Sequence, residues 1–319
     1  MNLEQVRALA AIVDTGSFEL AARALHLTPS AVSQRVRALE SSVGQVVVRR
    51  VHPCTATEAG AVLVRLARQV ELLEEDSRDL LGIAREAPVV LRIAVNADSL
   101  DTWLVDLLDA AASWDDSRLR FSIVHEDRTL TLLRQGECAA AVSTVSQPVP
   151  GCRSHPLGVM RYLPVAAPGL AARFSGTDGE LDWDAMPVLR YDDHDHVQEQ
   201  FLAARGRATS SPASQVPSSP GLKSALLAGM GWLLVPEATV AEELTDGRIV
   251  TLSDEFVDVV LHWHVWKVPS HRLERLNDAV LQAARTGLRP LPKRPRGARS
   301  GQRVRSSGRE RDGEPRLVD

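Results

Sequence analysis

The sequence predicts an α/β protein that carries an all-α head on a long linker helix, and three observations lead to this fold class. Residues 18–44 contain two short helical segments separated by a tight polar break. Residues 57–85 repeat apolar side chains in alternating steps of four and three. From Val89 onward, strand-like and helix-like segments alternate, which is the pattern of α/β units around a mostly parallel sheet.

Length and composition set limits on the possible classes of protein. The chain has 319 residues, enough for two or three domains, and a hydrophobic content of 44% supports sizeable cores. Its three cysteines lie far apart without a CxxC spacing, which argues for a reducing compartment and against a zinc finger. Because no apolar run reaches membrane-spanning length and the N-terminus lacks a signal-peptide pattern, we expect a cytoplasmic protein with no membrane partner.

The head is predicted as three helices followed by a small wing. The first helix covers residues 2–14, and Ser17 or Thr15 can cap the second, which ends at about Leu25. Thr28 and Pro29 open the third helix and Gly44 ends it. Residues 46–51 together with Thr55 then suggest a two-stranded wing with its turn near His52–Pro53.

The third helix has an inward apolar stripe and an outward polar face. At 100° per residue, Ser30, Ser33, Gln34 and Arg37 fall on the outward side, and Arg35 lies on its flank. A recognition helix reads base edges from its N-terminal residues, and Gln can pair with adenine while Arg suits phosphates. The predicted DNA-binding residues are Ser17, Thr28, Pro29, Ser30, Ser33, Gln34, Arg35, Arg37 and the wing arginines Arg49 and Arg50.

The linker helix is expected to pair with a second copy. Arginines barely outnumber carboxylates in residues 1–60, so a single head should bind DNA weakly. The apolar positions of residues 57–85 form one narrow heptad seam, which is better explained by another helix than by burial in a globule. The seam consists of Ala59, Leu63, Leu66, Val70, Leu73, Leu80 and Ala84, interrupted by Ser77.

Residues 89–287 read as strands and helices in alternation. Strands are predicted at 89–95, 121–126, 138–144, 161–167, 187–191, 232–236 and 257–267. Helices are predicted from the polar corner at 96–99 through about Ala112, and at 130–135, 221–228 and 272–286. The segment 288–319 is rich in Arg, Pro, Gly and Ser, so we predict a disordered basic tail.

The chain resembles the LysR-type transcriptional regulators. The residues that carry this resemblance are FELAARALHLTPSAVSQRVRALESSVG (18–44) and TEAG (57–60), followed by VNADSLDTW (95–103), residues 132–166 and VPSS (216–219). The wing, with HPCTATEAG, is similar to the branch that regulates arginine and lysine export, the ArgP and LysG type. This branch is also described as inhibiting the initiation of chromosome replication.

The resemblance implies a winged helix-turn-helix at 1–58, a linker or dimerisation helix at 59–87 and an effector-binding domain at 88–287. That domain would have two subdomains like a periplasmic binding protein, with subdomain I at 89–162 and 267–287 and subdomain II at 163–266. The implied protein is a homodimeric or homotetrameric regulator that binds double-stranded DNA and a small effector. The effector is expected to be lysine or arginine, with an amino-acid exporter gene as the target and RNA polymerase as a further partner.

Three polar corners, the last of them ahead of the predicted helix at 221–228, are the candidate effector contacts, since open α/β sheets bind ligands beyond the carboxyl ends of their strands. They lie at residues 96–99, 143–146 and 217–219, and by resemblance they are the effector-facing segments of the family. A basic side chain also needs a carboxylate, for which Asp98 and Asp193 are candidates. The predicted effector residues are Asn96, Ala97, Asp98, Ser99, Trp103, Ser143, Thr144, Asp193, Ser218 and Ser219.

Other chemistry is not supported. His194 with His196, and His262 with His264, lack a third ligand at sensible spacing, so we expect no metal site. Because there is no nucleophile elbow, Walker motif or GxGxxG fingerprint, we expect neither an enzyme nor a cofactor. Two other interpretations stay open: an effector-independent architectural or replication-inhibiting protein on AT-rich DNA, and a solute-binding protein, which the head opposes.

Overall fold

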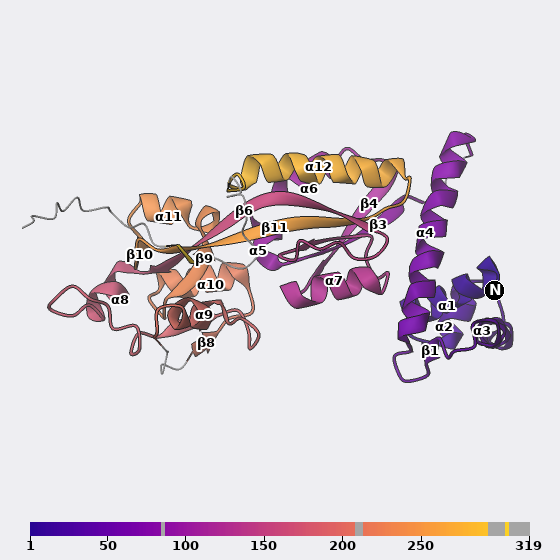
Figure 1. The fold of residues 1–319 in the computed structure, drawn as a ribbon, viewed down its shortest axis with the longest axis horizontal. Helices are drawn as coiled ribbons and strands as arrows, with labels where there is room; N and C mark the ends of the chain where they lie inside the picture. Colours follow the sequence, from indigo (N-terminus) through magenta and orange to yellow (C-terminus); the bar gives the residue numbers. More distant parts are fainter. Residues whose placement is uncertain (84–86, 208–212, 293–303, 306–319) are drawn as a thin grey trace, which may run out of the picture. The chain divides into compact units, whose positions relative to one another are not determined.

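The computed structural model describes residues 1–83, 87–207, 213–292 and 304–305 (Figure 1). The chain divides into two compact units. The first consists of Met1–Gly158 with Leu261–Leu288, and the second of Val159–Val260 with Arg289–Asp319. The predicted basic tail falls almost entirely outside the described residues, apart from 288–292 and the two-residue strand β12 (Val304–Arg305).

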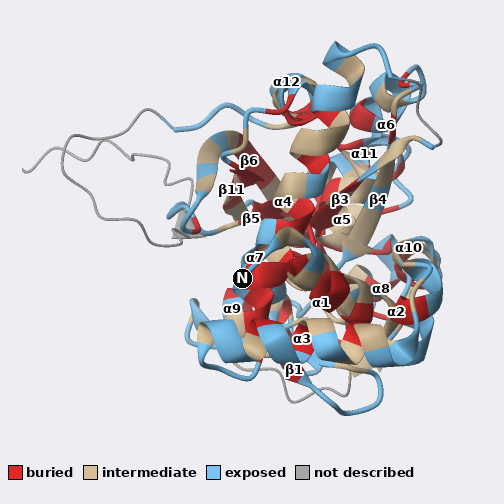
Figure 2. Ribbon diagram, turned by 90° about the vertical axis from the view of Figure 1, so that its right-hand side faces the viewer, coloured by how far each residue is buried: buried red, intermediate tan, exposed pale blue. Residues whose placement is uncertain are grey.

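The head consists of α1 (Leu3–Thr15), α2 (Phe18–Ala24) and α3 (Pro29–Val43). Asn2 and Gln5 form a reciprocal capping box at the start of α1, and Thr28 caps α3 by accepting a hydrogen bond from the Ala31 N–H. Gly16 and Gly44 end α1 and α3 in the left-handed conformation that glycine adopts without strain. The buried faces of these helices form one core (Figure 2).

The wing is shorter than the sequence suggests. Strand pairing is limited to β1 (Val48–Arg49) with β2 (Thr55–Ala56), whereas the apolar run at 46–51 predicts a six-residue strand. Val47 and Val48 are buried in the head core, but Val46 and Val51 are exposed, so the apolar run does not mark the paired segment.

The linker helix α4 (Glu58–Leu80) begins directly against the wing. Thr57 caps it, and a side chain at Gly60 would overlap the carbonyl oxygen of Val47. The glycine of the TEAG segment is therefore required because α4 approaches the backbone of Val47 closely at this point. The prediction of a helix to residue 85 is too long, since α4 ends at Leu80, and seam position Ala84 lies outside the described residues.

The first unit continues with a sheet of β3 (Val89–Val95), β4 (Ser117–Ile123) and β5 (Ala140–Ser143), in which β3 pairs parallel with both neighbours. The end of β11 (Phe256–Trp266) pairs antiparallel with β5, so the sheet is mixed. On one face lie α6 (Val105–Ala111) and α12 (His271–Gly287), and on the other α7 (Glu126–Arg134) (Figure 1).

The helix predicted from residues 96–99 through Ala112 is wrong. The structure has two short helices, α5 (Ala97–Asp101) and α6, separated at Thr102–Leu104. The break lets Trp103 and Leu104 reach the interior, where both are buried.

The second unit is built on β6 (Cys152–Ala166), which pairs antiparallel with β9 (Leu233–Pro236) and β10 (Val250–Thr251). A separate pair, β7 (Val188–Arg190) and β8 (Ala213–Gln215), is parallel. The helices are α8 (Pro168–Arg173), α9 (Val197–Ala203), α10 (Ser219–Leu227), α11 (Ala241–Thr245) and the 3₁₀ turn η1 (Glu237–Thr239).

Strands β6 and β11 each belong to both units. The division falls at 158/159 in β6 and at 260/261 in β11, whereas the domain prediction placed it at 162/163 and 266/267. Both strands are uninterrupted at the division, so neither composition nor a turn signal marks it in the sequence.

Candidate functional site

The outward face of α3 is the candidate DNA-reading surface. Val32, Val36 and Leu39 are buried on its inner side. Ser30, Gln34 and Arg37 are exposed, together with Pro29 at the start of the helix, and Ser33 is half-buried. Exposed serine and glutamine side chains at the start of a helix are able to donate to and accept from base edges.

Several predicted DNA contacts also have local structural roles. Ser17 caps α2 by accepting from the Leu20 N–H, and its hydroxyl donates to Glu19. The hydroxyls of Thr28 and Ser30 lie 2.9 Å apart. Arg35 pairs with Glu4 of α1 at 3.0 Å, so this arginine contributes less free positive charge than its position on the helix suggests.

The wing places two arginines beside the head. Arg49 lies in β1 and is exposed, and the guanidinium of Arg50 lies 5.1 Å from the centre of the Phe18 ring. A cation held over an aromatic face keeps its charge while losing side-chain freedom. Both arginines remain available for phosphate contacts beside the recognition helix.

The first candidate effector corner, residues 96–99, has unsatisfied polar atoms. Asn96 precedes α5 without making a side-chain cap, and its Oδ1 atom is buried without a hydrogen-bond partner among the described residues. The same holds for the hydroxyl of Ser99, which is fully buried. Buried polar atoms usually have partners, so this corner is suited to receive a polar ligand. Ala97 and Asp98 are half-buried here.

Trp103 has a different environment from the rest of this corner. It is buried, and the backbone of α12 at Gly287 comes so close that an added Cβ would overlap the Trp103 side chain. Its place in the fold is the packing between the α5–α6 break and α12. Its Nε1 atom, like the polar atoms of Asn96 and Ser99, is buried without a hydrogen-bond partner among the described residues, and its role toward an effector stays a prediction.

The second corner follows β5. Ser143 is buried and its hydroxyl accepts a hydrogen bond from the Val145 N–H at 3.2 Å, which shapes the turn. Thr144 is half-buried, and Val145 is exposed. Since β3 and β5 are parallel neighbours, this corner and residues 96–99 lie at the same edge of the sheet in the first unit.

The remaining candidates belong to the second unit. Asp193 is exposed and accepts a hydrogen bond from the side chain of Gln215. Ser218 caps α10 by accepting from the Gly221 N–H at 3.3 Å, and Ser219 is the first residue of that helix. These residues are thus placed on two corners of one unit, and their role toward an effector stays a prediction.

A junction that sequence reasoning missed connects α4 to both the head and the sheet. Arg68 of α4 is buried and donates to the carboxylate of Asp14 in α1 and to the carbonyl oxygen of Gly136 after α7. Gly136 itself lies so close to the backbone of Arg65 that a Cβ there would overlap it. One arginine therefore bridges three parts of the first unit.

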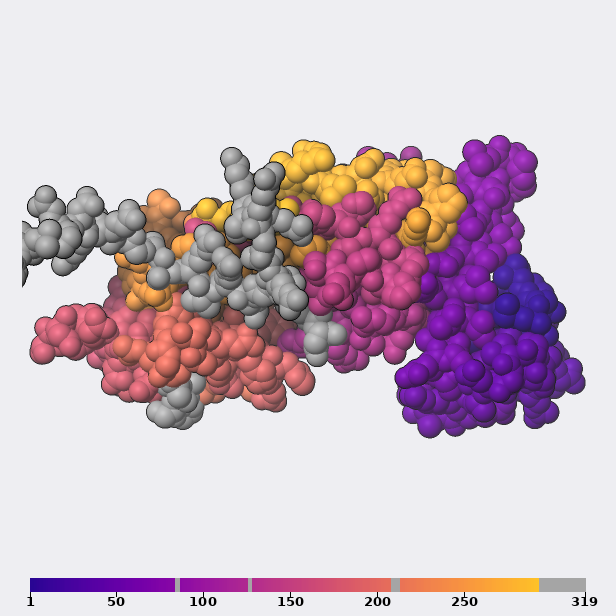
Figure 3. Space-filling model, viewed as in Figure 1, coloured from indigo at the N-terminus to yellow at the C-terminus, as the bar shows by residue number. Residues whose placement is uncertain are grey.

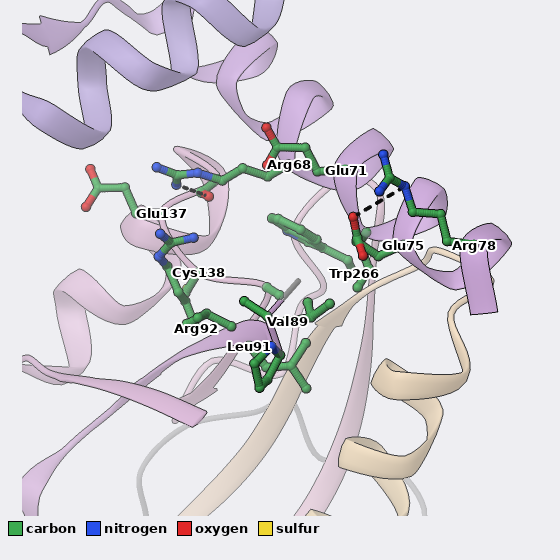
Figure 4. A pocket seen from close by; sticks show the side chains of 16 residues that line it. Arg68, Glu71, Glu75, Arg78, Val89, Leu91, Arg92, Glu137, Cys138 and Trp266 are labelled. Atoms are coloured by element: carbon green, nitrogen blue, oxygen red, sulfur yellow. Dashed lines mark hydrogen bonds and ion pairs between the residues drawn. The ribbon is translucent and has the colours of Figure 1, made fainter. Parts of the chain in front are cut away.

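Beside this junction lies a cavity of about 560 Å³ between α4 and β3 (Figure 4). Arg92 points into it from β3 to one side of the Trp266 ring, while Glu75 and Arg78 of α4 pair at its other end. Burial lowers the pKa of Arg92, and the neighbouring Arg68 and Arg120 lower it further against the raising effect of Asp14. The walls combine charges of both signs and favour no single ligand class.

A second junction joins the C-terminal half of α4 to α12. Arg272 is fully buried and donates to Asp76 and Asp79 of α4, while its Nε lies 3.6 Å from Asp116. Arg275 also donates to Asp116. We call these five residues, Asp76, Asp79, Asp116, Arg272 and Arg275, the α4–α12 clamp. Nothing in the local sequence pairs residues almost 200 positions apart, so no pattern could have revealed it.

The two histidine pairs, His194 with His196 and His262 with His264, do not form a metal-binding group within the described ranges. A search there finds one ligand group, Asp76 and Asp79 with His271. Both carboxylates are already bonded to Arg272, so a cation would have to displace that guanidinium. His262 and His264 are instead partly or fully buried on β11, and burial lowers the pKa of both.

Comparison with known proteins gives two family matches. The model for bacterial regulatory helix-turn-helix proteins of the lysR family matches residues 3–61, and that for the LysR substrate binding domain matches residues 84–289. The lysine export transcriptional regulatory protein LysG of Corynebacterium efficiens is 45% identical over 291 residues, which cover 91% of this chain and 100% of the relative.

Two solved structures are also similar. Full-length LysG from Corynebacterium glutamicum with bound effector Arg is 43% identical with a TM-score of 0.79. ArgP from Mycobacterium tuberculosis is 41% identical with a TM-score of 0.83. Each comparison covers 91% of this chain and 100% of the other. Among the described helices, none combines the length and apolarity needed to cross a bilayer.

Proposed function

Because the chain belongs to the LysR family of bacterial transcriptional regulators, we propose that it is a DNA-binding regulator whose effector is a basic amino acid, arginine or lysine. The observation that carries this proposal is the likeness to a full-length regulator with arginine bound, 43% identical over that protein's whole length. The name of the Corynebacterium efficiens relative, a lysine export transcriptional regulatory protein, supports an amino-acid exporter gene as the proposed target.

The head supports a DNA-reading role through its free side chains. We infer that α3 enters the major groove, where Gln34 and Ser30 contact base edges and Arg37 contacts phosphate. Arg49 and Arg50 of the wing would hold the flanking backbone. Ser17, Thr28, Pro29, Ser33 and Arg35 complete the predicted interface. Ser17 caps α2 as an acceptor, so donation to a phosphate would replace the bond from its hydroxyl to Glu19.

The linker helix supports pairing of two chains. Leu80 is 89% exposed and Val62 is 65% exposed, and the C-terminal half of α4 lies open on the surface in Figure 3. Such apolar side chains on a long helix favour a partner helix. We propose a homodimer through α4, or a tetramer built from such dimers, which places two weakly charged heads on separated half-sites.

Effector recognition is proposed at the polar corners. In the first unit, the unsatisfied Asn96 and Ser99 with Asp98, Ser143 and Thr144 are suited to the charged groups of an amino acid. Asp193, Ser218 and Ser219 of the second unit are the further candidates. Binding would shift the population of effector-domain states, and the effector must therefore prefer one of them. Operation in the cytoplasm follows from its expected DNA target.

The test combines calorimetry with footprinting. Arginine, lysine and histidine are titrated into the full chain, and the DNase footprint on the DNA upstream of its own gene and of neighbouring exporter genes is recorded with and without each. We expect saturable binding of arginine or lysine and a changed footprint. The proposal is refuted if none of the three amino acids alters the footprint or the melting temperature of the protein. An extended footprint over AT-rich DNA that ignores amino acids would support an architectural role instead.

A further inference from the structure

A buried histidine lies directly beneath the second effector corner. Strand β11 pairs with β5 so that His262 lies opposite Ser143 and His264 opposite Ala141. The side chain of His264 is 0% exposed, and its Nε2 atom lies 2.7 Å from the carbonyl oxygen of Val145. This contact joins residues 119 positions apart and reaches the turn that follows β5.

Polar contacts, and not apolar burial, fix this turn. The N–H of Val145 donates to the hydroxyl of Ser143 and its carbonyl oxygen accepts from His264, so both of its backbone groups are held. The next carbonyl oxygen, that of Ser146, accepts from the hydroxyl of Ser154. The Val145 side chain is itself 46% exposed and provides no core anchor. Loss of the His264 contact would therefore free one side of the corner.

The contact also defines which ring nitrogen of neutral His264 carries the proton. A carbonyl oxygen only accepts hydrogen bonds, so Nε2 must carry the proton, while Nδ1 is buried with no partner among the described residues. Burial lowers the pKa of His264, the bond to Val145 opposes this, and Arg134 of α7 and His155 of β6 lower it further. His262 on the same strand is a further titratable neighbour, with its own pKa lowered by burial and by His264.

We propose that His264 is a positioning residue for effector binding, and that the corner at 143–146 keeps its binding geometry only while this imidazole is neutral. The proposal rests on the proposed effector role of Ser143 and Thr144. Protonation would place a buried positive charge beside Arg134, His155 and His262. The ring would have to move out to be solvated, which removes the hydrogen bond to Val145.

Two substitutions separate this role from simple packing. His264→Gln retains an N–H donor at about the position of Nε2 but cannot be protonated, whereas His264→Leu fills similar space and leaves the Val145 carbonyl oxygen unpaired. His262→Gln is the matched control on the same strand. Each full-length variant is titrated with L-arginine and L-lysine by calorimetry between pH 7.5 and 5.5, where the ligands keep their charged groups.

Because burial lowers the pKa of His264 below its ordinary value of 6.5, we expect wild-type affinity to hold at pH 6.5 and above and to fall only at lower pH. His264→Gln should bind within about threefold of wild type, with little change across the range. His264→Leu should lose about tenfold at every pH, as expected when a partly buried acceptor loses its partner. His262→Gln should keep the wild-type pH profile. The proposal is overturned if His264→Leu binds like wild type, or if His264→Gln shows the wild-type pH dependence.

Hydrogen exchange keeps the inference testable even if no amino acid binds. In that case the proposed function fails, but the corner can still be examined in the unliganded chain. Faster exchange of the Val145 amide in His264→Leu, restored in His264→Gln at equal melting temperatures, supports the positioning role. Equal exchange in wild type and His264→Leu overturns it.

Discussion

Replacing Arg272 with methionine should break the α4–α12 clamp and strongly destabilise the first unit. Arg272 is fully buried and serves two carboxylates, of which Asp76 is also buried. Removing one partner of a buried ion pair costs about 3–5 kcal/mol because the other charge stays desolvated. The side chain of Asp79 is 20% exposed and can be partly solvated, so we expect about 3 kcal/mol, the lower end of that range.

The assay is urea unfolding of the full chain, followed by fluorescence, with Arg78→Met as the matched control. Arg78 lies on α4 close to Asp76 and Asp79, is 55% exposed and pairs with Glu75 at 3.8 Å, so its loss should cost less than about 1 kcal/mol. If Arg272→Met lies within about 1 kcal/mol of Arg78→Met, the clamp does not stabilise the unit as argued. The Arg272→Met variant should still bind arginine, but the change that arginine causes in the DNA footprint should be weaker than in wild type.

The clamp also predicts a pH dependence. Burial alone would raise the pKa of Asp116, but hydrogen bonds from Arg275 and Ser117 and the charges of Arg275 and Arg272 lower it to about 2. A carboxyl with a lowered pKa contributes stability that is fully present above its ordinary value of 3.8 and is lost as the pH falls toward 2. Because Arg275 is the main cause of this lowering, the stability difference between wild type and Arg275→Met should shrink over this window, as measured by urea unfolding at stepped pH.

Three further predictions concern the head and linker. Gly60→Ala should lower stability by about 1–3 kcal/mol, because the added methyl group overlaps the wing. Gly169→Ala should be nearly neutral, because its added methyl group meets nothing within 4 Å. Calorimetric melting of both variants measures the difference. In DNA-binding titrations, Gln34→Ala should reduce the preference for the specific sequence by about 1–3 kcal/mol. Arg37→Ala should instead weaken binding to all sequences alike and reduce the slope of affinity against salt concentration by about one. Identical effects of the two substitutions would contradict the proposed docking. Leu80→Asp should weaken association of the chains in light scattering, and an unchanged assembly mass would exclude this part of α4 from the interface.

The recognition helix was predictable because local signals define it completely. Thr28, Pro29 and Gly44 mark its ends, and the period of Val32 and Val36 marks its inner face. None of these signals depends on distant residues, so one sequence suffices to place the outward face.

The effector corners were predictable only in part. Polar residues after β3 and β5 are visible in the sequence, but the break at Thr102–Leu104 is not, since it depends on packing against α12. The sequence shows His264 only as one of two histidines on a predicted strand without metal-ligand spacing. It could not connect His264 to Val145, because β11 is distant in the chain and its register with β5 is a tertiary property. Arg68 and Arg272 escaped notice for the same reason.

The double attachment of Arg68 bears on the construction of chimeric regulators and amino-acid biosensors. This side chain binds Asp14 on one side and the Gly136 carbonyl oxygen on the other. A chimera joined within α4 that imports a foreign head without a carboxylate at position 14 would leave a buried guanidinium half-satisfied. Such a hybrid could read its new operator and still respond poorly to its ligand. A head transplanted between relatives should therefore carry a carboxylate at this position, or one should be introduced there.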